Sequence, residues 1–202
     1  MPLTQHYRRP MDVELVDPPG VLVMPDGPPR AAVLVRGSSG RVEVGRCRLL
    51  AARGVTAASV RWFGGPGQPP GICEVSLEQF APVLDRVADL APRLALVGTS
   101  KGAEAVLLLA ADDERVAVTC ALAPTSVVWA NLGPGLDGAE HPYRSSWTRE
   151  GRPLPFVPYD DSWATSSEPP AYVGLYESSL ARFADRAVGA AIPVERSPAP
   201  CS

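Results

Sequence analysis

The chain has 202 residues, of which 46% are hydrophobic and 20% charged, which is the composition of an ordinary globular domain. Its 19 basic and 22 acidic residues give a net charge of −3, so it lacks the positive surface that nucleic acids or anionic membranes attract. Four scattered cysteines and only two histidines, His6 and His141, exclude a zinc-type cluster or a disulfide framework. We therefore expect no nucleic-acid partner, no metal and no bound cofactor.

The chain shows no targeting or membrane signal. The first ten residues lack the apolar core of a signal peptide, and the longest apolar run, residues 105–111, is far shorter than the roughly 18 residues that a membrane helix needs. We expect a cytoplasmic protein without a membrane partner.

Hydrophobic periodicity predicts strands and helices that alternate along the chain. The first two strands are joined by a Pro-Pro-Gly turn and form an opening hairpin, and the later strands are uninterrupted apolar runs, as in a parallel sheet buried on both faces. We expect strands at 11–16, 21–24, 31–35, 55–63, 94–97 and 116–122, and helices at 42–53, 77–91, 101–110 and 172–188.

Two local signals concern the second of these helices. Ser76 and Gln79 have the spacing of a capping box, which predicts a helix start there. Pro82 would remove a backbone donor inside that helix, so we expect a kink or a later start of the helix. Near the end of the chain, residues 192–194 are predicted to be extended.

The alternation of strands and helices predicts an α/β fold: a mostly parallel sheet with helices on both faces, whose site lies at the carboxyl ends of the strands. Residues 1–202 are interpreted as one domain. Residues 131–170 contain seven prolines and several aromatic residues but no regular period, which is typical of a lid.

The segment Gly98-Thr99-Ser100-Lys101-Gly102 follows a predicted buried strand and opens a predicted helix, as a nucleophile elbow G-x-S-x-G requires. Ser100 is then the catalytic nucleophile, and the backbone N–H of Lys101, at the positive end of the helix dipole, is one donor of the oxyanion hole. The alternative is a tight turn in which Ser100 only caps the helix.

Residues 36–40, Arg-Gly-Ser-Ser-Gly, leave the neighbouring central strand where hydrolases of this architecture present a second oxyanion donor. We assign that donor to the backbone N–H of Ser38. Lys101 and Glu104 are three residues apart and are predicted to form a surface ion pair without a catalytic role.

Several segments resemble the α/β-hydrolase domain of acyl-CoA thioesterases and bile acid-CoA:amino acid N-acyltransferases. Residues 36–40 are similar to the H-G-S-G-G of that family, and residues 98–104 to its G-x-S-K-G-A-E. Residues 63–67 with 75–78 resemble its Y-G-G-P-G and I-P-L-E, residues 146–155 its lid, and residues 192–195 its I-P-V-E. The resemblance runs from about residue 29 to the end, and it implies hydrolysis of an acyl-CoA or related thioester in fatty acid metabolism.

The chain departs from that family in two ways. Arg36 replaces a histidine, although the oxyanion donor there is a backbone N–H. The chain also ends where the family continues into the strands and loops that carry its catalytic aspartate and histidine, so the C-terminal strands of the fold are absent and activity would be severely impaired without a base. His141, oriented by Asp160 or Asp161, is a weaker substitute.

The sequence thus predicts a serine hydrolase that cleaves small-molecule acyl-thioesters through an acyl-Ser100 intermediate, with residues 131–170 as a lid over an apolar site. One alternative is an impaired hydrolase-like protein that binds only ligands or partners, and another is a hydrolase of small esters or dienelactones. Cys47, Cys73 and Cys120 are interpreted as small buried apolar residues. An early end of the sheet would leave 116–122 as an apolar edge, which predicts self-association.

Overall fold

A computed structural model describes residues 10–131, 142–164 and 172–197, so that His6, His141 and Cys201 lie outside the described residues. The chain divides into two compact units. The first unit comprises Met1–Arg61, Phe80–Ala123 and Val194–Ser202, and the second comprises Trp62–Gln79 and Pro124–Pro193.

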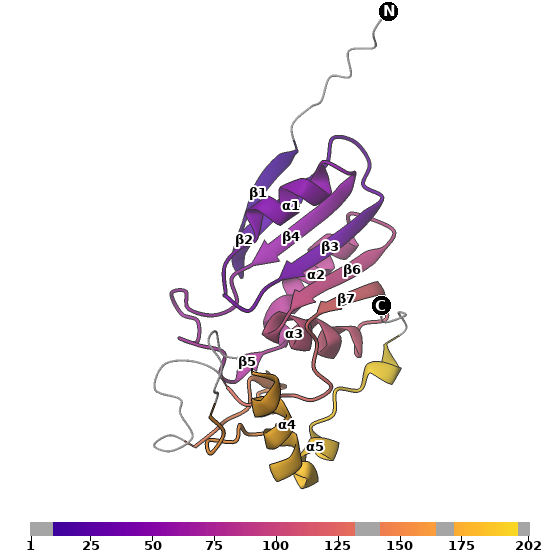
Figure 1. Ribbon diagram of the computed structural model, residues 1–202. Helices are drawn as coiled ribbons and strands as arrows, with labels where there is room; N and C mark the ends of the chain where they lie inside the picture. The colour runs from indigo at the N-terminus through magenta and orange to yellow at the C-terminus, as the bar shows by residue number, and fades with distance from the viewer. Residues whose placement is uncertain (1–9, 132–141, 165–171, 198–202) are drawn as a thin grey trace, which may run out of the picture. The chain divides into compact units, whose positions relative to one another are not determined.

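The first unit is built on a six-stranded sheet (Figure 1). The strands β1 and β2 form the predicted antiparallel hairpin, β2 is also antiparallel to β4, and the remaining pairs, β4-β3, β3-β6 and β6-β7, are parallel. The predicted α/β fold class, a mostly parallel sheet with an opening hairpin, is confirmed. In sheet order the strands are β1 (Met11–Val16), β2 (Pro19–Met24), β4 (Val55–Val60), β3 (Ala31–Arg36), β6 (Leu94–Thr99) and β7 (Val116–Leu122).

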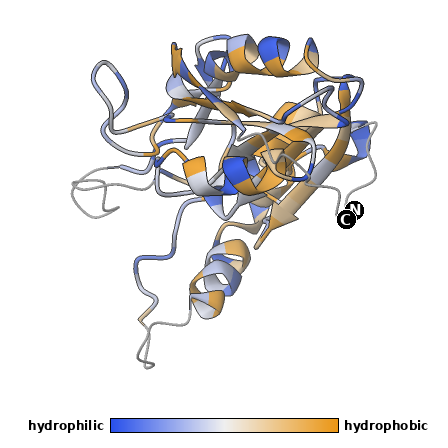
Figure 2. Cartoon of the chain, turned by 90° about the horizontal axis from the view of Figure 1, so that it is seen from above, coloured by the Kyte–Doolittle hydropathy of each residue, from blue (hydrophilic) through white to orange (hydrophobic). Residues whose placement is uncertain are grey.

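Helices cover both faces of this sheet because side chains alternate between the faces along each strand. Val21, Val23 and Ala57 pack with Cys47 and Ala51 of α1 (Val44–Ala51), and Ala95 and Val97 of β6 lie on that same face. Gly98 and the alternate residues of β6 face the other way, toward α3 (Lys101–Ala110). Apolar residues accordingly concentrate in the strands of the sheet (Figure 2).

The start of α2 (Ala81–Ala88) differs from the predicted capping box. Ser76 lies in β5 (Val75–Ser76), and its hydroxyl donates to the carboxylate of Glu78 instead of accepting from the backbone of Gln79. A short 3-10 turn, Glu78–Phe80, precedes the helix, so that Pro82 falls in the first turn of α2. Pro82 removes no helical hydrogen bond at that position, which explains why the later start predicted for this helix is observed and no kink is needed.

Strand β7 is the outer strand of the sheet within the described residues, because β6 is its one partner there. Val118 and Leu122 are 44% and 46% exposed, and β7 contains neither a charged residue nor a proline. These are the features that natural edge strands usually avoid. The self-association predicted for this edge remains a prediction.

The second unit contains a small sheet of β5, β8 (Trp147–Arg149) and β9 (Arg152–Pro153), together with α4 (Val173–Arg182) and α5 (Ala184–Gly189). Trp147 is fully buried and stacks on Trp62, with ring centroids 5.1 Å apart. The helix predicted over 172–188 is interrupted at Phe183, whose φ and ψ of −117° and 38° lie outside the helical region. The lid role predicted for 131–170 stays a prediction.

Two further sequence predictions need correction. Val194–Arg196 forms a 3-10 turn, so the extended structure predicted for 192–194 is wrong at its last residue.

Cys47 is fully buried, as predicted, and burial raises the pKa of its thiol to about 12. Cys73 and Cys120 are only half-buried.

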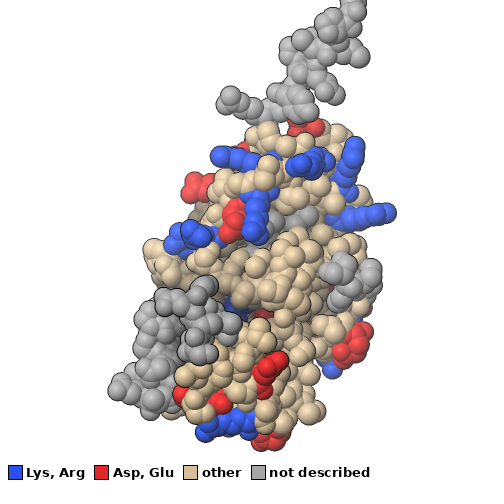
Figure 3. Space-filling model, viewed as in Figure 1, with Lys and Arg blue, Asp and Glu red and all other residues tan. Residues whose placement is uncertain are grey.

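Basic and acidic side chains both appear on each unit on the face shown in Figure 3. No large patch of a single charge is visible on that face. Among the described residues, no helix has the length and apolar character that crossing a bilayer requires. The same residues contain no group of three or more His, Cys, Asp or Glu side chains that could hold a metal ion.

Helix α3 approaches β6 so closely that Gly98 leaves no room for a side chain. A Cβ built on Gly98 would lie 2.2 Å from the carbonyl oxygen of Gly102 and 2.7 Å from the nitrogen of Ala103, both of which are backbone atoms. Strand and helix therefore touch through their main chains, and this contact fixes the turn between them.

We expect Gly98→Ala to lower the free energy of unfolding by about 1–3 kcal/mol, because the helix must move to admit the methyl group. Gly45→Ala on α1 is the matched control: nothing lies within 4 Å of the added Cβ, and the change should be neutral or stabilising. Urea unfolding of both variants measures the difference. Equal stabilities would show that the close approach is not a constraint on the fold.

Candidate active site

Ser100 lies at the turn from β6 to α3, in the backbone conformation of a nucleophile elbow. Its φ of 54° and ψ of −122° fall in a region that L-residues rarely adopt, at a cost of about 1–3 kcal/mol. Ser100 is nevertheless exposed at the carboxyl end of a central strand. The strain keeps an exposed hydroxyl at the top of the sheet, where a substrate carbonyl could reach it.

Backbone hydrogen bonds hold Ser100 on both sides. Its N–H donates to the carbonyl of Leu122 at the end of β7, at 2.9 Å. Its carbonyl accepts from Ala103 and Glu104 at 2.8 and 3.1 Å, which starts α3. Lys101 is the first residue of that helix, so its N–H belongs to the turn whose N–H groups point out of the helix and carry the positive end of its dipole.

Ser38 lies beside the elbow. Strand β3 pairs with β6 in the register Arg36↔Gly98, so that the segment leaving β3 runs next to Thr99 and Ser100. The Ser38 hydroxyl donates to the carbonyl of Thr99 at 2.8 Å, which ties the two strand exits together. The structure therefore brings the predicted donor segment to the predicted nucleophile, while the role of the Ser38 N–H remains a prediction.

The ion pair of Lys101 and Glu104 is buried, and the prediction of a surface pair is wrong. The two groups are 3.2 Å apart, and their side chains are 5% and 1% exposed. The prediction failed because it considered only the spacing of the two residues. Every residue of α3 is buried, and the apolar run 105–110 leaves the helix no polar face, so that a charge within it is buried as well.

Burial lowers the pKa of the Lys101 ammonium, and the neighbouring Glu104 carboxylate opposes this shift. Separating a buried ion pair costs more than separating a surface pair, because each charge would then lack compensation in the interior. The first turn of α3, which carries the N–H of Lys101, is thus fixed from inside the protein as well as by the elbow.

The predicted substitute for a catalytic base cannot be placed, because His141 lies outside the described residues. The carboxylates suggested to orient it are engaged elsewhere in the second unit. Asp160 accepts from Ser162 at 2.6 Å and from Arg182 at 2.7 Å, and Asp161 accepts from the Tyr143 hydroxyl at 2.6 Å. The part of the chain that the structure describes contains no histidine.

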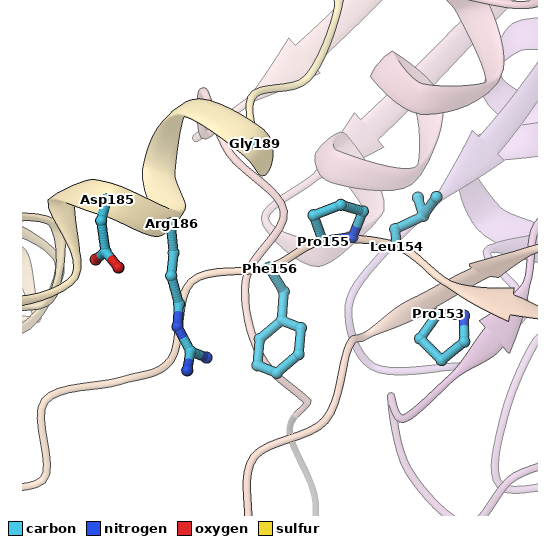
Figure 4. A pocket seen from close by; sticks show the side chains of 7 residues that line it. All are labelled: Pro153, Leu154, Pro155, Phe156, Asp185, Arg186 and Gly189. Carbon is cyan, nitrogen blue, oxygen red and sulfur yellow. The ribbon is translucent and has the colours of Figure 1, made fainter.

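The second unit contains cavities that no pattern in the sequence indicates. One of about 440 Å³ lies between residues 153–156 and α5, where Phe156 and Arg186 are among its lining side chains (Figure 4). Another, of about 520 Å³, is lined mainly by aromatic residues. Tyr143, Tyr159 and Trp163 belong to the aromatic residues of the irregular segment 131–170, and without a helical or strand period the sequence gives no sign that they share a cavity.

No protein-family model and no curated protein sequence matches the chain significantly. Solved structures of similar fold include TT1662 from Thermus thermophilus, with 22% identity, 59% of each chain covered and a TM-score of 0.43. The α/β hydrolase GrgF from Penicillium sp. sh18 shows 20% identity and a TM-score of 0.45 over 60% of this chain and 47% of that one. A cold-adapted esterase from an Arctic intertidal metagenomic library shows 22% identity and a TM-score of 0.41 over 60% and 65%.

The chain thus spans 59% of the length of TT1662 and 47% of the length of GrgF. Similarity at this level says nothing of substrate, and we infer function from the residues of the chain itself.

The buried pair can be tested by a double-mutant cycle. Lys101→Met and Glu104→Gln should each lower the free energy of unfolding by about 3–5 kcal/mol, since each leaves one buried charge without its partner. The double variant should lose less than the sum of the two losses, because it leaves no charge behind.

Arg46→Met is the control for this cycle. Arg46 pairs with Glu43 at the same i, i+3 spacing, but at 3.6 Å and with a side chain that is 51% exposed. Its removal should cost at most about 0.5 kcal/mol. Losses of unfolding free energy at Lys101 and Glu104 that are additive and as small as the loss in Arg46→Met would contradict a buried pair.

Proposed function

We propose that the chain is a serine hydrolase that cleaves acyl-thioesters through an acyl-Ser100 intermediate. The observation that carries this proposal is the exposed Ser100 at φ 54° and ψ −122°, at the carboxyl end of β6 and the start of α3. A residue is held in such a strained conformation when the surrounding structure requires it, and such residues cluster at active sites.

The residues of the elbow suggest how the reaction proceeds. The Ser100 hydroxyl attacks the acyl carbonyl and loses its proton to a base, and the negative charge moves onto the carbonyl oxygen. The N–H groups of Lys101 and Ser38 are proposed to receive this oxyanion from two neighbouring strand exits. Collapse of the tetrahedral intermediate expels the thiolate, and water then releases the acid from Ser100.

This mechanism requires a base that accepts the proton of Ser100, and the residues of the turn do not include one. A serine hydroxyl without a base attacks slowly, although oxyanion stabilisation and binding alone retain about 10³–10⁴-fold over water. The resemblance to acyl-CoA thioesterases places an aspartate and a histidine after I-P-V-E, to which residues 192–195 correspond. A protein that only binds acyl ligands is therefore the alternative that the first experiment must separate.

A fluorophosphonate probe should label the protein at Ser100, because such probes report a serine that is both exposed and activated. Labelling should disappear in Ser100→Ala and persist in Ser39→Ala, which removes an exposed hydroxyl from the neighbouring loop. Peptide mass spectrometry identifies the labelled residue. Absence of labelling of the wild-type protein across the whole pH range of its stability would end the enzyme proposal and favour the binding alternative.

The substrate class is tested by comparing kcat/KM for a series of acyl-CoA thioesters with that for p-nitrophenyl esters of the same acids. A thioesterase should prefer the thioesters although the aryl esters carry the better activated leaving group. Equal or faster turnover of the aryl esters would replace the thioesterase proposal with a hydrolase of small esters.

A further inference from the structure

Aromatic rings gather around the cavity of about 520 Å³ in the second unit. This volume lies within the roughly 300–1,000 Å³ typical of small-molecule sites. All four tyrosines that the structure describes line the cavity, together with one tryptophan: Tyr143, Tyr159, Tyr172, Tyr176 and Trp163. Rings from the segment before α4 and from α4 itself thus converge on one space.

Most of these rings are held in place by other rings. Tyr159 stacks on the buried Trp129, with centroids 5.5 Å apart and planes 3° from parallel, and Tyr176 tilts onto the same indole at 5.0 Å. Tyr143 meets Tyr159 edge to face at 5.6 Å. One buried indole therefore supports three tyrosines, directly or through Tyr159, so that little ordering is needed when a ligand enters.

The position of Trp163 depends on a glycine of α4. A Cβ on Gly174 would lie 2.8 Å from Nε1 of Trp163, so the indole packs against the helix only because no side chain stands there. Trp163 lies 6.3 Å from the ring of Tyr172, which is 54% exposed. Trp163 is the ring type with the strongest attraction for a cation.

The charge of the cavity is negative. Asp160 and Asp161 both line it, and no lysine or arginine is among the described residues that do. The Ser162 hydroxyl and the Arg182 guanidinium hold the pKa of Asp160 below its usual range, and Arg182 balances its charge. Asp161 accepts from Tyr143 and is the second carboxylate of the cavity, whereas the Arg182 guanidinium pairs with Asp160.

We propose that this cavity binds a small organic cation of the quaternary or alkylated ammonium class. Ring faces attract cations by their quadrupole, and the attraction is strongest when the cation loses its water. A metal ion would need a cluster of ligating side chains, whereas an alkylated ammonium group offers the apolar surface that five rings can cover. Asp161 supplies the counter-charge.

Calorimetric titration with choline and with its neutral isostere 3,3-dimethylbutan-1-ol tests this proposal. The two molecules have nearly the same shape, so the difference in affinity reports the charge. Choline should bind at least about tenfold more tightly, the factor that corresponds to 1.4 kcal/mol. Equal or tighter binding of the alcohol, or no binding of choline, would overturn the proposal.

Variants localise the site. Trp163→Leu should weaken choline binding by about five- to thirtyfold, as expected for loss of a partly desolvated cation–π contact. Asp161→Asn, which keeps an acceptor for Tyr143, should weaken choline binding but leave the affinity for the alcohol unchanged. Unchanged choline affinity in both variants, with unfolding midpoints like that of the wild type, would place choline elsewhere and refute the site.

Two controls separate this proposal from the other features of the chain. Leu154→Ala truncates a half-buried side chain of the neighbouring cavity of the second unit and should leave choline binding intact. Ser100→Ala should do the same, because the proposed cation site does not use the elbow. Loss of choline binding in either control would contradict the assignment to the aromatic cavity.

Discussion

The contact between the main chains of β6 and α3 is the constraint on which the candidate active site depends. Gly98 and Gly102 lie so close that even a methyl group on Gly98 would meet a carbonyl oxygen at 2.2 Å. A chain that leaves a strand and enters a helix at this separation has no relaxed path between them. Ser100, the residue at the bend, takes up the strain in its own φ and ψ, and its side chain stays exposed.

The same helix shows how an apolar environment changes the contribution of a charged pair to stability. Lys101 and Glu104 have the i, i+3 spacing of many surface pairs, yet both side chains are buried. On a surface such a pair contributes a few tenths of a kcal/mol, whereas inside the protein each charge depends on the other. The pair thus links the position of the first turn of α3 to the integrity of the core.

The strands, the hairpin and the elbow could be predicted from sequence because each has a local cause: apolar runs, a Pro-Pro-Gly turn, and glycines on both sides of Ser100. The burial of Glu104 could have been predicted from the apolar residues that follow it, since a helix without a polar face has no exposed side. The capping box predicted at Ser76 does not form, because the Ser76 hydroxyl donates to the carboxylate of Glu78. The convergence of Tyr143, Tyr159 and Trp163 depends on tertiary packing around Trp129, which no local pattern encodes.

The hydrogen bond from the Ser100 N–H to Leu122 has a mechanical consequence. It anchors Ser100 to the last residue of β7, the outer strand of the sheet within the described residues, and outer strands open readily in thermal fluctuations. The rigidity of the turn at Ser100 therefore depends on the carboxyl end of β7. Fraying of that end would expose the Ser100 amide to solvent exchange and let the turn relax. A segment that pairs with β7 would therefore stabilise the turn at Ser100 without contacting that residue.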